Sequence, residues 1–137
     1  MQPLKQLTLD LAVTGQIEAG DLPALAAAGY RMMIVNRPDG EDPGQPSFAA
    51  MAAAARAAGL DARHIPIATA SGATEQDAAA FNAARAEAGG KVIAYCRTGN
   101  RCAVLWALGQ KGLRDGDAIV ADAAAAGCDL SAIRPRL

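Results

Sequence analysis

Residues 91–108 constrain the fold more than any other part of the chain. Positions 91–95 are mostly apolar and favour a strand, whereas positions 103–108 favour a helix. Between them, positions 96–101 read Cys-Arg-Thr-Gly-Asn-Arg. A strand that leads through a short glycine-containing loop into a helix turns successive backbone N–H groups toward a bound anion. The sequence therefore predicts a strand–loop–helix unit with an anion-binding cysteine at its junction.

Strand-like and helix-like segments alternate along the rest of the chain. One or two short strands are expected at 7–13, and single strands at 31–36, 64–67 and 91–95. Helices are expected at 21–28, 48–58, 75–88, 101–113 and 117–126. Residues 37–46 are expected to be loop and residues 131–137 a last short turn. This alternation predicts an α/β fold with a mostly parallel central sheet flanked by helices. Residues 1–137 are expected to form a single domain.

Polar residues at three helix starts predict caps. Asp21 and Ser47 are expected to cap the helices that follow them, and Thr74 with Asp77 has the form of a capping box. Pro66 indicates that the strand around it lies at an edge or ends there.

Charge and composition exclude several classes of function. The formal net charge is −1 and no basic run occurs, so bulk-charge binding to nucleic acid or to a membrane surface is not expected. No segment reaches the roughly 18 consecutive apolar residues of a membrane span, and no signal peptide is seen. The three cysteines form no metal-ligand pattern. We therefore expect a cytoplasmic protein with reduced thiols and without a cofactor or metal.

Cys96 and Arg101 are the expected catalytic residues. The positive end of the following helix and the neighbouring arginines favour the thiolate over the thiol, which makes Cys96 a nucleophile. Arg101 is expected to bind the transferred group or its anionic donor. The alternatives are that Cys96 is a buried structural thiol and that Arg101 faces solvent.

Six further residues are assigned to substrate binding. Thr98 and Asn100 are expected to contribute backbone N–H groups, and Gly99 allows an unusual backbone conformation. Arg97 lies in the same loop, although it is equally compatible with an exposed side chain. The other two residues are Cys102 and Arg37.

Cys102 and Arg37 each have an ordinary alternative to substrate binding. For Arg37 it is a place in a turn in which Asp39 and Gly40 reverse the chain. Cys102 is either a resolving thiol for Cys96 or a small residue packed in the first helical turn. Arg37 follows a strand, so it belongs to the same sheet edge as Cys96 and can bind an anionic substrate there. Asp39 is more readily explained as part of a turn than as a general acid, and His64 as a strand-end residue than as a base.

The order of these pieces resembles the beta-lactamase-hydrolase-like, phosphatase-like domain family, also described as a family of sulfur transferases. The resemblance runs from about residue 6 to residue 113. It rests on the segments 13–16, 35–41, 57–60, 64–67, 96–101 and 105–108. It implies a fold like that of the dual-specificity phosphatases and thiolate chemistry on Cys96. It also implies a persulfide dioxygenase as a possible partner, although this chain lacks that enzyme's histidine-rich zinc motif.

Two positions depart from the family pattern. Relatives usually carry Ser or Thr where this chain has Cys102, and a thiol is expected to hydrogen-bond the thiolate poorly. Many phosphatases have His where this chain has Tyr95.

Three functions remain open, with sulfur transfer preferred. Four residues separate Cys96 from Arg101, as in rhodanese-type sulfurtransferases, whereas tyrosine and dual-specificity phosphatases have five. The expected sulfur donor is a small anion, either thiosulfate or a glutathione persulfide, and a Cys96 persulfide is the intermediate. The alternative is a phosphatase, which needs a general acid, but residues 68–73 contain no carboxylate. The third is a redox-sensing module that uses Cys96 and Cys102.

Overall fold

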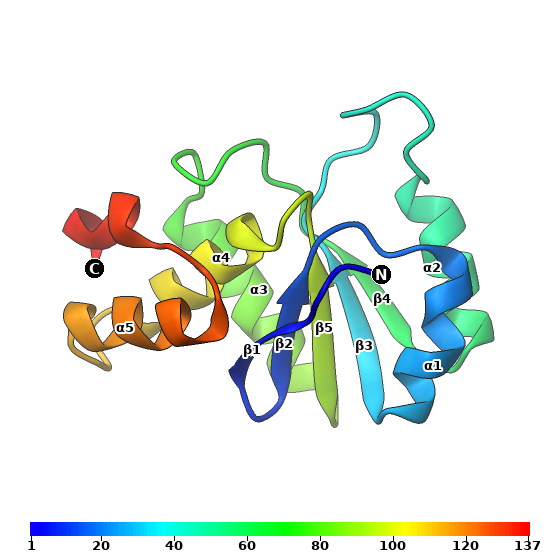
Figure 1. Cartoon of the computed structure of the whole chain (residues 1–137), viewed down its shortest axis with the longest axis horizontal. Coiled ribbons are helices and arrows are strands. Elements are labelled where there is room, and N and C mark those ends of the chain that lie inside the picture. The colour runs from blue at the N-terminus through cyan, green and yellow to red at the C-terminus, as the bar shows by residue number, and fades with distance from the viewer.

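A five-stranded sheet runs through the middle of the molecule and carries helices on both faces (Figure 1). The computed structural model describes all of residues 1–137. The strands lie in the order β1-β2-β5-β3-β4, and only β1 is antiparallel to its neighbour. The strands are β1 (Lys5–Thr8), β2 (Leu11–Thr14), β3 (Tyr30–Val35), β4 (Asp61–His64) and β5 (Lys91–Tyr95). The helices are η1 (Ala19–Asp21), α1 (Leu22–Ala27), α2 (Phe48–Ala57), α3 (Glu75–Glu87), α4 (Asn100–Gln110), α5 (Gly116–Ala126) and η2 (Ser131–Arg136).

The central strand β5 divides the core in two. Val92 and Ala94 face one hydrophobic cluster, whereas Ile93 and Tyr95 face the other, as strand alternation requires. Helices α3, α4 and α5 cover the first face of the sheet, and α1 and α2 cover the second (Figure 1). Because β5 pairs in parallel with both β2 and β3, its carboxyl end lies in the middle of the sheet edge where ligands bind in such folds.

The α/β class with a mostly parallel sheet is confirmed, and so are two of the three caps. The Ser47 hydroxyl accepts the Ala50 N–H at 3.1 Å. The Thr74 hydroxyl and the Asp77 carboxylate exchange hydrogen bonds with each other's backbone N–H, each at 3.0 Å. The cap at Asp21 is wrong, because its carboxylate turns back to accept the Glu18 N–H at 2.9 Å. That bond closes the short turn η1 instead of capping α1.

Element boundaries differ from the sequence expectation at several places. The stretch expected at 7–13 is two short antiparallel strands, β1 and β2, joined by a turn. The strand expected at 64–67 is wrong in its bounds, because β4 spans Asp61–His64. Ile65 and Ile67 still donate to backbone carbonyls of the β3 segment at 3.0 Å, but Pro66 between them has no N–H to offer. The edge position expected from Pro66 is confirmed. Helix α4 ends at Gln110 instead of 113, just before Gly112 adopts a φ of 81°.

None of the five α-helices combines the length and the apolar character needed to cross a bilayer.

Candidate active site

The Cys96 loop, residues 96–101, joins the end of β5 to the start of α4. The Cys96 N–H donates to the Thr14 carbonyl at 3.3 Å, which fixes the loop to the end of β2. The Gly99 N–H points back and donates to Cys96 Sγ at 3.1 Å. Gly99 has a φ of 94°, and a Cβ there would come within 3.1 Å of the Thr14 backbone nitrogen. This position therefore requires glycine both for its conformation and for space.

The buried thiol of Cys96 is acidic. Its pKa is lowered from 9.0 to about 5, chiefly by a hydrogen bond from the Cys102 side chain. Burial raises the pKa, but the backbone N–H groups of Thr98, Cys102 and Gly99 lower it further. Cys96 is therefore a thiolate at neutral pH, although the residue is only 1% exposed. A low thiol pKa is typical of a reactive cysteine and not of an inert structural thiol, so it favours the catalytic role predicted for Cys96.

Cys102 holds the opposite protonation state. It is fully buried, and burial raises the pKa of its thiol well above the ordinary value. Cys102 therefore stays protonated, and the neighbouring Cys96 thiolate raises its pKa further. The side chain of Cys102 is the first cause of the lowered Cys96 pKa, whereas the expectation that a thiol is a poor hydrogen-bond partner for the thiolate stays a prediction.

Arg101 is held by Glu41, which comes from the loop after β3. The two side chains form a pair of hydrogen bonds, with Nη1–Oε2 at 2.6 Å and Nη2–Oε1 at 2.9 Å. Arg101 Nη1 also donates to the Ile67 carbonyl at 2.8 Å, and Glu41, together with the charge of Cys96, raises the pKa of its guanidinium. The Arg101 side chain is only 11% exposed, so the solvent-facing alternative does not apply.

Arg37 lies at the expected sheet edge, but its nitrogens are already in use. Its Nε donates to Glu41 at 2.9 Å, its Nη1 to Gln16 at 2.8 Å, and its Nη2 to Asp42. The side chain is 5% exposed. Substrate binding by Arg37 remains a prediction that requires one of these partners to be released.

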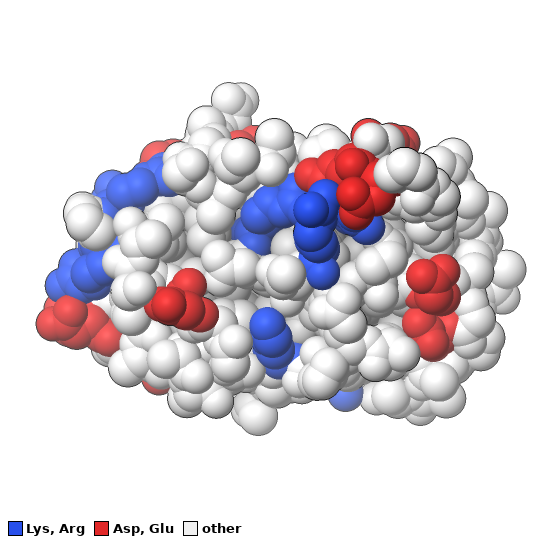
Figure 2. Space-filling view, turned by 45° about the horizontal axis from the view of Figure 1, so that its top comes forward, with Lys and Arg blue, Asp and Glu red and all other residues white.

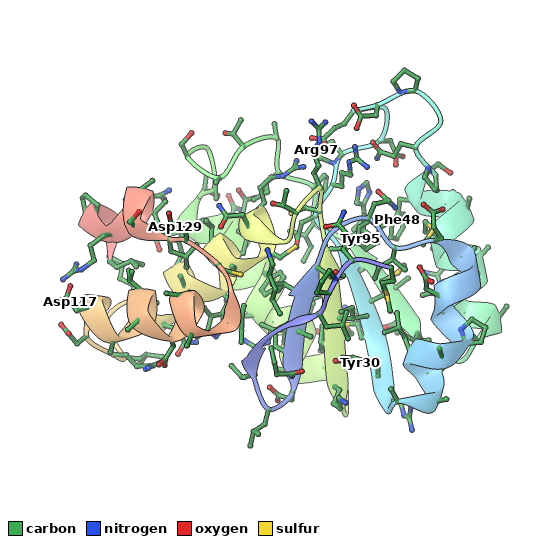
Figure 3. All side chains as sticks on the ribbon, viewed as in Figure 1. Tyr30, Phe48, Tyr95, Arg97, Asp117 and Asp129 are labelled. Carbon is green, nitrogen blue, oxygen red and sulfur yellow. The ribbon has the colours of Figure 1, made fainter.

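Arg97 is the most open side chain of the loop. It is 55% exposed and lies 3.4 Å from Asp42, at the carboxyl ends of the strands (Figure 3). Basic and acidic side chains gather side by side on this face of the molecule (Figure 2). A network of ion pairs on this face joins Arg37, Glu41, Asp42, Arg97 and Arg101.

The remaining loop residues are Thr98 and Asn100, and the Asn100 N–H, expected to help hold the anion, donates to the Thr98 hydroxyl at 3.3 Å. Thr98 is exposed and Asn100 is half-buried. The Lys5 ammonium donates to the Thr98 carbonyl at 3.1 Å, which ties the loop to β1. Substrate contacts by Arg97, Thr98, Gly99, Asn100 and Cys102 remain predictions.

Glu41 is the site residue that sequence reasoning missed. Its pKa is lowered to about 2, chiefly by the hydrogen bond from Arg101 and with a further contribution from Arg37. The available indication was its position: Glu41 lies in the loop 37–46, which follows the parallel strand β3 and therefore reaches the same sheet edge as Cys96. Asp39, considered earlier as a possible acid, accepts the Phe48 N–H at 2.8 Å and so belongs to the start of α2.

His64 and Tyr95 have structural surroundings. The His64 ring stacks on Phe48 with centroids 4.5 Å apart, and its Nε2 lies 3.2 Å from the Arg37 carbonyl oxygen. Tyr95 points into the core cluster beneath α1 and α2, where burial raises its pKa to about 12. Neither residue contacts the thiolate as a base.

Solved structures share this fold. A candidate phosphatase from Neisseria meningitidis is 34% identical, with a TM-score of 0.86, and the alignment covers 96% of this chain and 93% of that one. Tk-PTP in its active form is 18% identical, with a TM-score of 0.72 and coverage of 97% and 91%. TpbA of P. aeruginosa in complex with pTyr is 16% identical, with a TM-score of 0.63 and coverage of 97% and 88%. The last two likenesses concern the fold alone.

Fold and site together define a cysteine-dependent enzyme with a phosphatase-like fold. The model of the family described as "Beta-lactamase hydrolase-like protein, phosphatase-like domain" matches residues 3–113, and the chain belongs to this family. A beta-lactamase hydrolase-like protein of Agrobacterium fabrum is 43% identical over 100 residues, and one of Xylella fastidiosa is 42% identical over 100 residues. Each match covers 73% of this chain but only 23% of the relative. The chain thus corresponds to one part of these longer proteins.

Proposed function

We propose that this protein is a sulfurtransferase in which Cys96 accepts a sulfur atom from a small anionic donor, thiosulfate or glutathione persulfide. The observation that carries the proposal is a thiolate without an available general acid. Attack of a thiolate on sulfur needs no proton donor, whereas cleavage of an alkyl phosphate needs one for the leaving alkoxide.

The carboxylates of the loop 37–46 are all engaged. Glu41 has a pKa of about 2 and stays ionised between Arg37 and Arg101. Asp42 pairs with Arg37 and Arg97, and Asp39 accepts the N–H at the start of α2. The other loop at this edge, residues 68–73, contains no carboxylate. A proton donor for an alkoxide is therefore missing on both sides of Cys96.

The proposed transfer uses the groups that surround the thiolate. The Cys96 thiolate attacks the outer sulfur of thiosulfate, the S–S bond of the donor breaks, and sulfite leaves with the electron pair. Cys96 then carries a persulfide, whose negative charge the loop N–H groups and Arg101 stabilise. A thiol or cyanide removes the outer sulfur and regenerates the thiolate. A persulfide dioxygenase would be a suitable partner, because it consumes persulfide products.

A phosphatase is the second candidate, and the comparisons favour it. The relatives and neighbours named above are described as phosphatases or hydrolase-like proteins, and none of these descriptions refers to sulfur transfer. A thiolate beside an arginine can also attack phosphorus. Without an acid, this activity is expected to favour aryl phosphates, whose leaving groups need little protonation.

Parallel steady-state assays on one preparation test the two functions. Thiocyanate formation from thiosulfate and cyanide, and aryl phosphate hydrolysis, are measured for the wild type and for Cys96→Ser. We expect Cys96-dependent thiocyanate formation to have the larger kcat/KM. Cys96-dependent phosphate release without thiocyanate formation would replace this proposal with the phosphatase.

A further inference from the structure

A cavity of about 280 Å³ lies beside the Cys96 loop and has no part in the mechanism above. Three separate segments line it: the loop after β4, the first turns of α4, and the C-terminal segment that includes Asp129 (Figure 3). Its apolar lining consists of Ala70, Val104, Leu130, Ala132 and Ile133. The volume suits a single ring or a short chain rather than a large ligand.

The cavity adjoins the reactive loop on two sides. Asn100 lines the cavity and is both the fifth residue of the Cys96 loop and the first of α4. On the opposite side, Ala70 follows Ile67 and Ala68, whose carbonyls accept hydrogen bonds from Arg101 at 2.8 and 3.4 Å. The loop and the cavity thus share Asn100, and this adjacency is the basis for placing the organic group of a donor in the cavity while its reactive sulfur is at Cys96.

The lining selects for an apolar group. No lysine or arginine lines the cavity. Its one carboxylate, Asp129, already accepts hydrogen bonds from the Ser131 N–H and hydroxyl at 3.0 and 2.7 Å. An anionic group in the cavity would find no positive partner, whereas an uncharged hydrocarbon group would be removed from water. Anion recognition is thus confined to the loop, and apolar recognition to the cavity.

The C-terminal segment supplies half of this lining. Asp129, Leu130, Ala132 and Ile133 all lie beyond residue 113, where the match to the family model ends. The matched region thus contains the reactive loop, and the following segment adds a wall beside it.

We propose that this cavity binds the apolar organic group of a small sulfur donor of the persulfide or thiosulfonate class. The inference rests on the proposed sulfur transfer and changes its preferred donor to one with an apolar organic group, which thiosulfate lacks and which the charged peptide of glutathione persulfide does not provide. With a thiosulfonate, the Cys96 thiolate attacks the outer sulfur, the S–S bond breaks, and the organic sulfinate leaves with the electron pair. Throughout this step the organic group remains in the cavity.

Variants that fill the cavity test the binding of the donor's organic group separately from the reaction of its sulfur at Cys96. The probes are benzenethiosulfonate, which carries an apolar ring, and thiosulfate, which carries none, and the readout is the rate of Cys96 persulfide formation. Ala132→Phe is suitable because Ala132 lines the cavity and is exposed, so the larger side chain can be accommodated by the fold. Ala125→Phe, on the exposed surface of α5 outside the cavity lining, is the matched control.

Wild-type protein is expected to react faster with benzenethiosulfonate than with thiosulfate. Ala132→Phe should lower kcat/KM for benzenethiosulfonate by about ten-fold, the order expected when a ring loses its apolar site. The same variant should leave the thiosulfate rate unchanged, and Ala125→Phe should alter neither rate. Ala70→Phe, on the opposite wall, should repeat the donor-selective loss and guards against a folding defect in the first variant.

Two results are decisive against the inference. Equal benzenethiosulfonate rates in the wild type and both cavity variants, with thiosulfate still loading Cys96, would overturn the cavity assignment and leave the proposed function intact. Failure of both donors to load Cys96 in the wild type would overturn the proposed function and the cavity assignment together.

Discussion

Glu41 and Arg101, sixty positions apart in the sequence, are joined by two hydrogen bonds of 2.6 and 2.9 Å. The glutamate side chain is 17% exposed and that of the arginine 11%, so the pair is largely shielded from solvent. The contact connects the loop after β3 to the first turn of α4. It fixes the direction of a guanidinium whose pKa is raised by Glu41 and by the charge of Cys96.

Glu41→Gln should disturb this arrangement. The amide retains one acceptor but loses the charge that balances Arg37 and Arg101, so the free energy of unfolding should fall by about 1–3 kcal/mol. The rate of Cys96 persulfide formation should fall by about ten-fold, because Arg101 is no longer held in place. Chemical denaturation and loading rates measure the two effects. Glu87→Gln, which removes only an exposed pair with Arg63, is the control and should change both very little.

The lowered pKa of Cys96 predicts the pH dependence of its reactivity. The thiolate is the reactive form, so alkylation by iodoacetamide should increase as the pH rises through about 5 and should then level off by neutral pH. Thiolate absorbance in the ultraviolet gives an independent titration, with Cys96→Ser as the blank. A midpoint near the ordinary value of 9.0 would contradict the site as described.

The Cys102 thiol should be replaceable by a hydroxyl but not by a methyl group. Cys102→Ala removes the donor that contributes most to the lowered pKa, so the pKa of Cys96 should rise by about 1 unit or more. Cys102→Ser keeps a donor of similar size and should leave the pKa low. The same thiolate titration distinguishes the two variants. An unchanged midpoint in Cys102→Ala would show that the backbone N–H groups suffice alone.

Gly99→Ala tests the conformation of the loop. Gly99 and Gly59 have nearly the same φ, 94° and 96°, but only at Gly99 would a Cβ approach other backbone atoms, those of Thr14. Gly59→Ala should cost about 1 kcal/mol of stability from backbone strain alone. Gly99→Ala should cost more, and it should also slow Cys96 alkylation because the loop must shift. Equal stability losses in the two variants would mean that the loop adapts without strain.

The fold could be predicted from the sequence because its signals are local. Apolar runs, caps such as Ser47 and Thr74, and helix-ending glycines each act within a few residues, and the family resemblance covered the same segments. Asp21 shows the limit, because its carboxylate accepts the N–H of Glu18, three residues earlier, and not an N–H of the helix that follows. Local signals therefore predict which helices and strands form more reliably than the residues at which each begins and ends.

The candidate site was only partly predictable for a different reason. Cys96 and its loop are contiguous in the sequence, whereas the partners that orient Arg101 and occupy Arg37 come from distant segments. Glu41 stands in a loop of turn-forming residues, where nothing in the local pattern distinguishes it from Asp39 or Asp42. Only the parallel pairing of β3 with β5 brings the loop of Glu41 to the sheet edge at which Cys96 lies.

Intact mass spectrometry after incubation with thiosulfate tests the central claim most directly. The reduced protein should gain the mass of one sulfur atom, Cys96→Ser should gain none, and Cys102→Ser should gain it as the wild type does. Cyanide should then remove the added mass as thiocyanate. A wild-type protein that stays unmodified, while it releases phosphate from an aryl phosphate in a Cys96-dependent manner, would contradict sulfur transfer and establish the phosphatase.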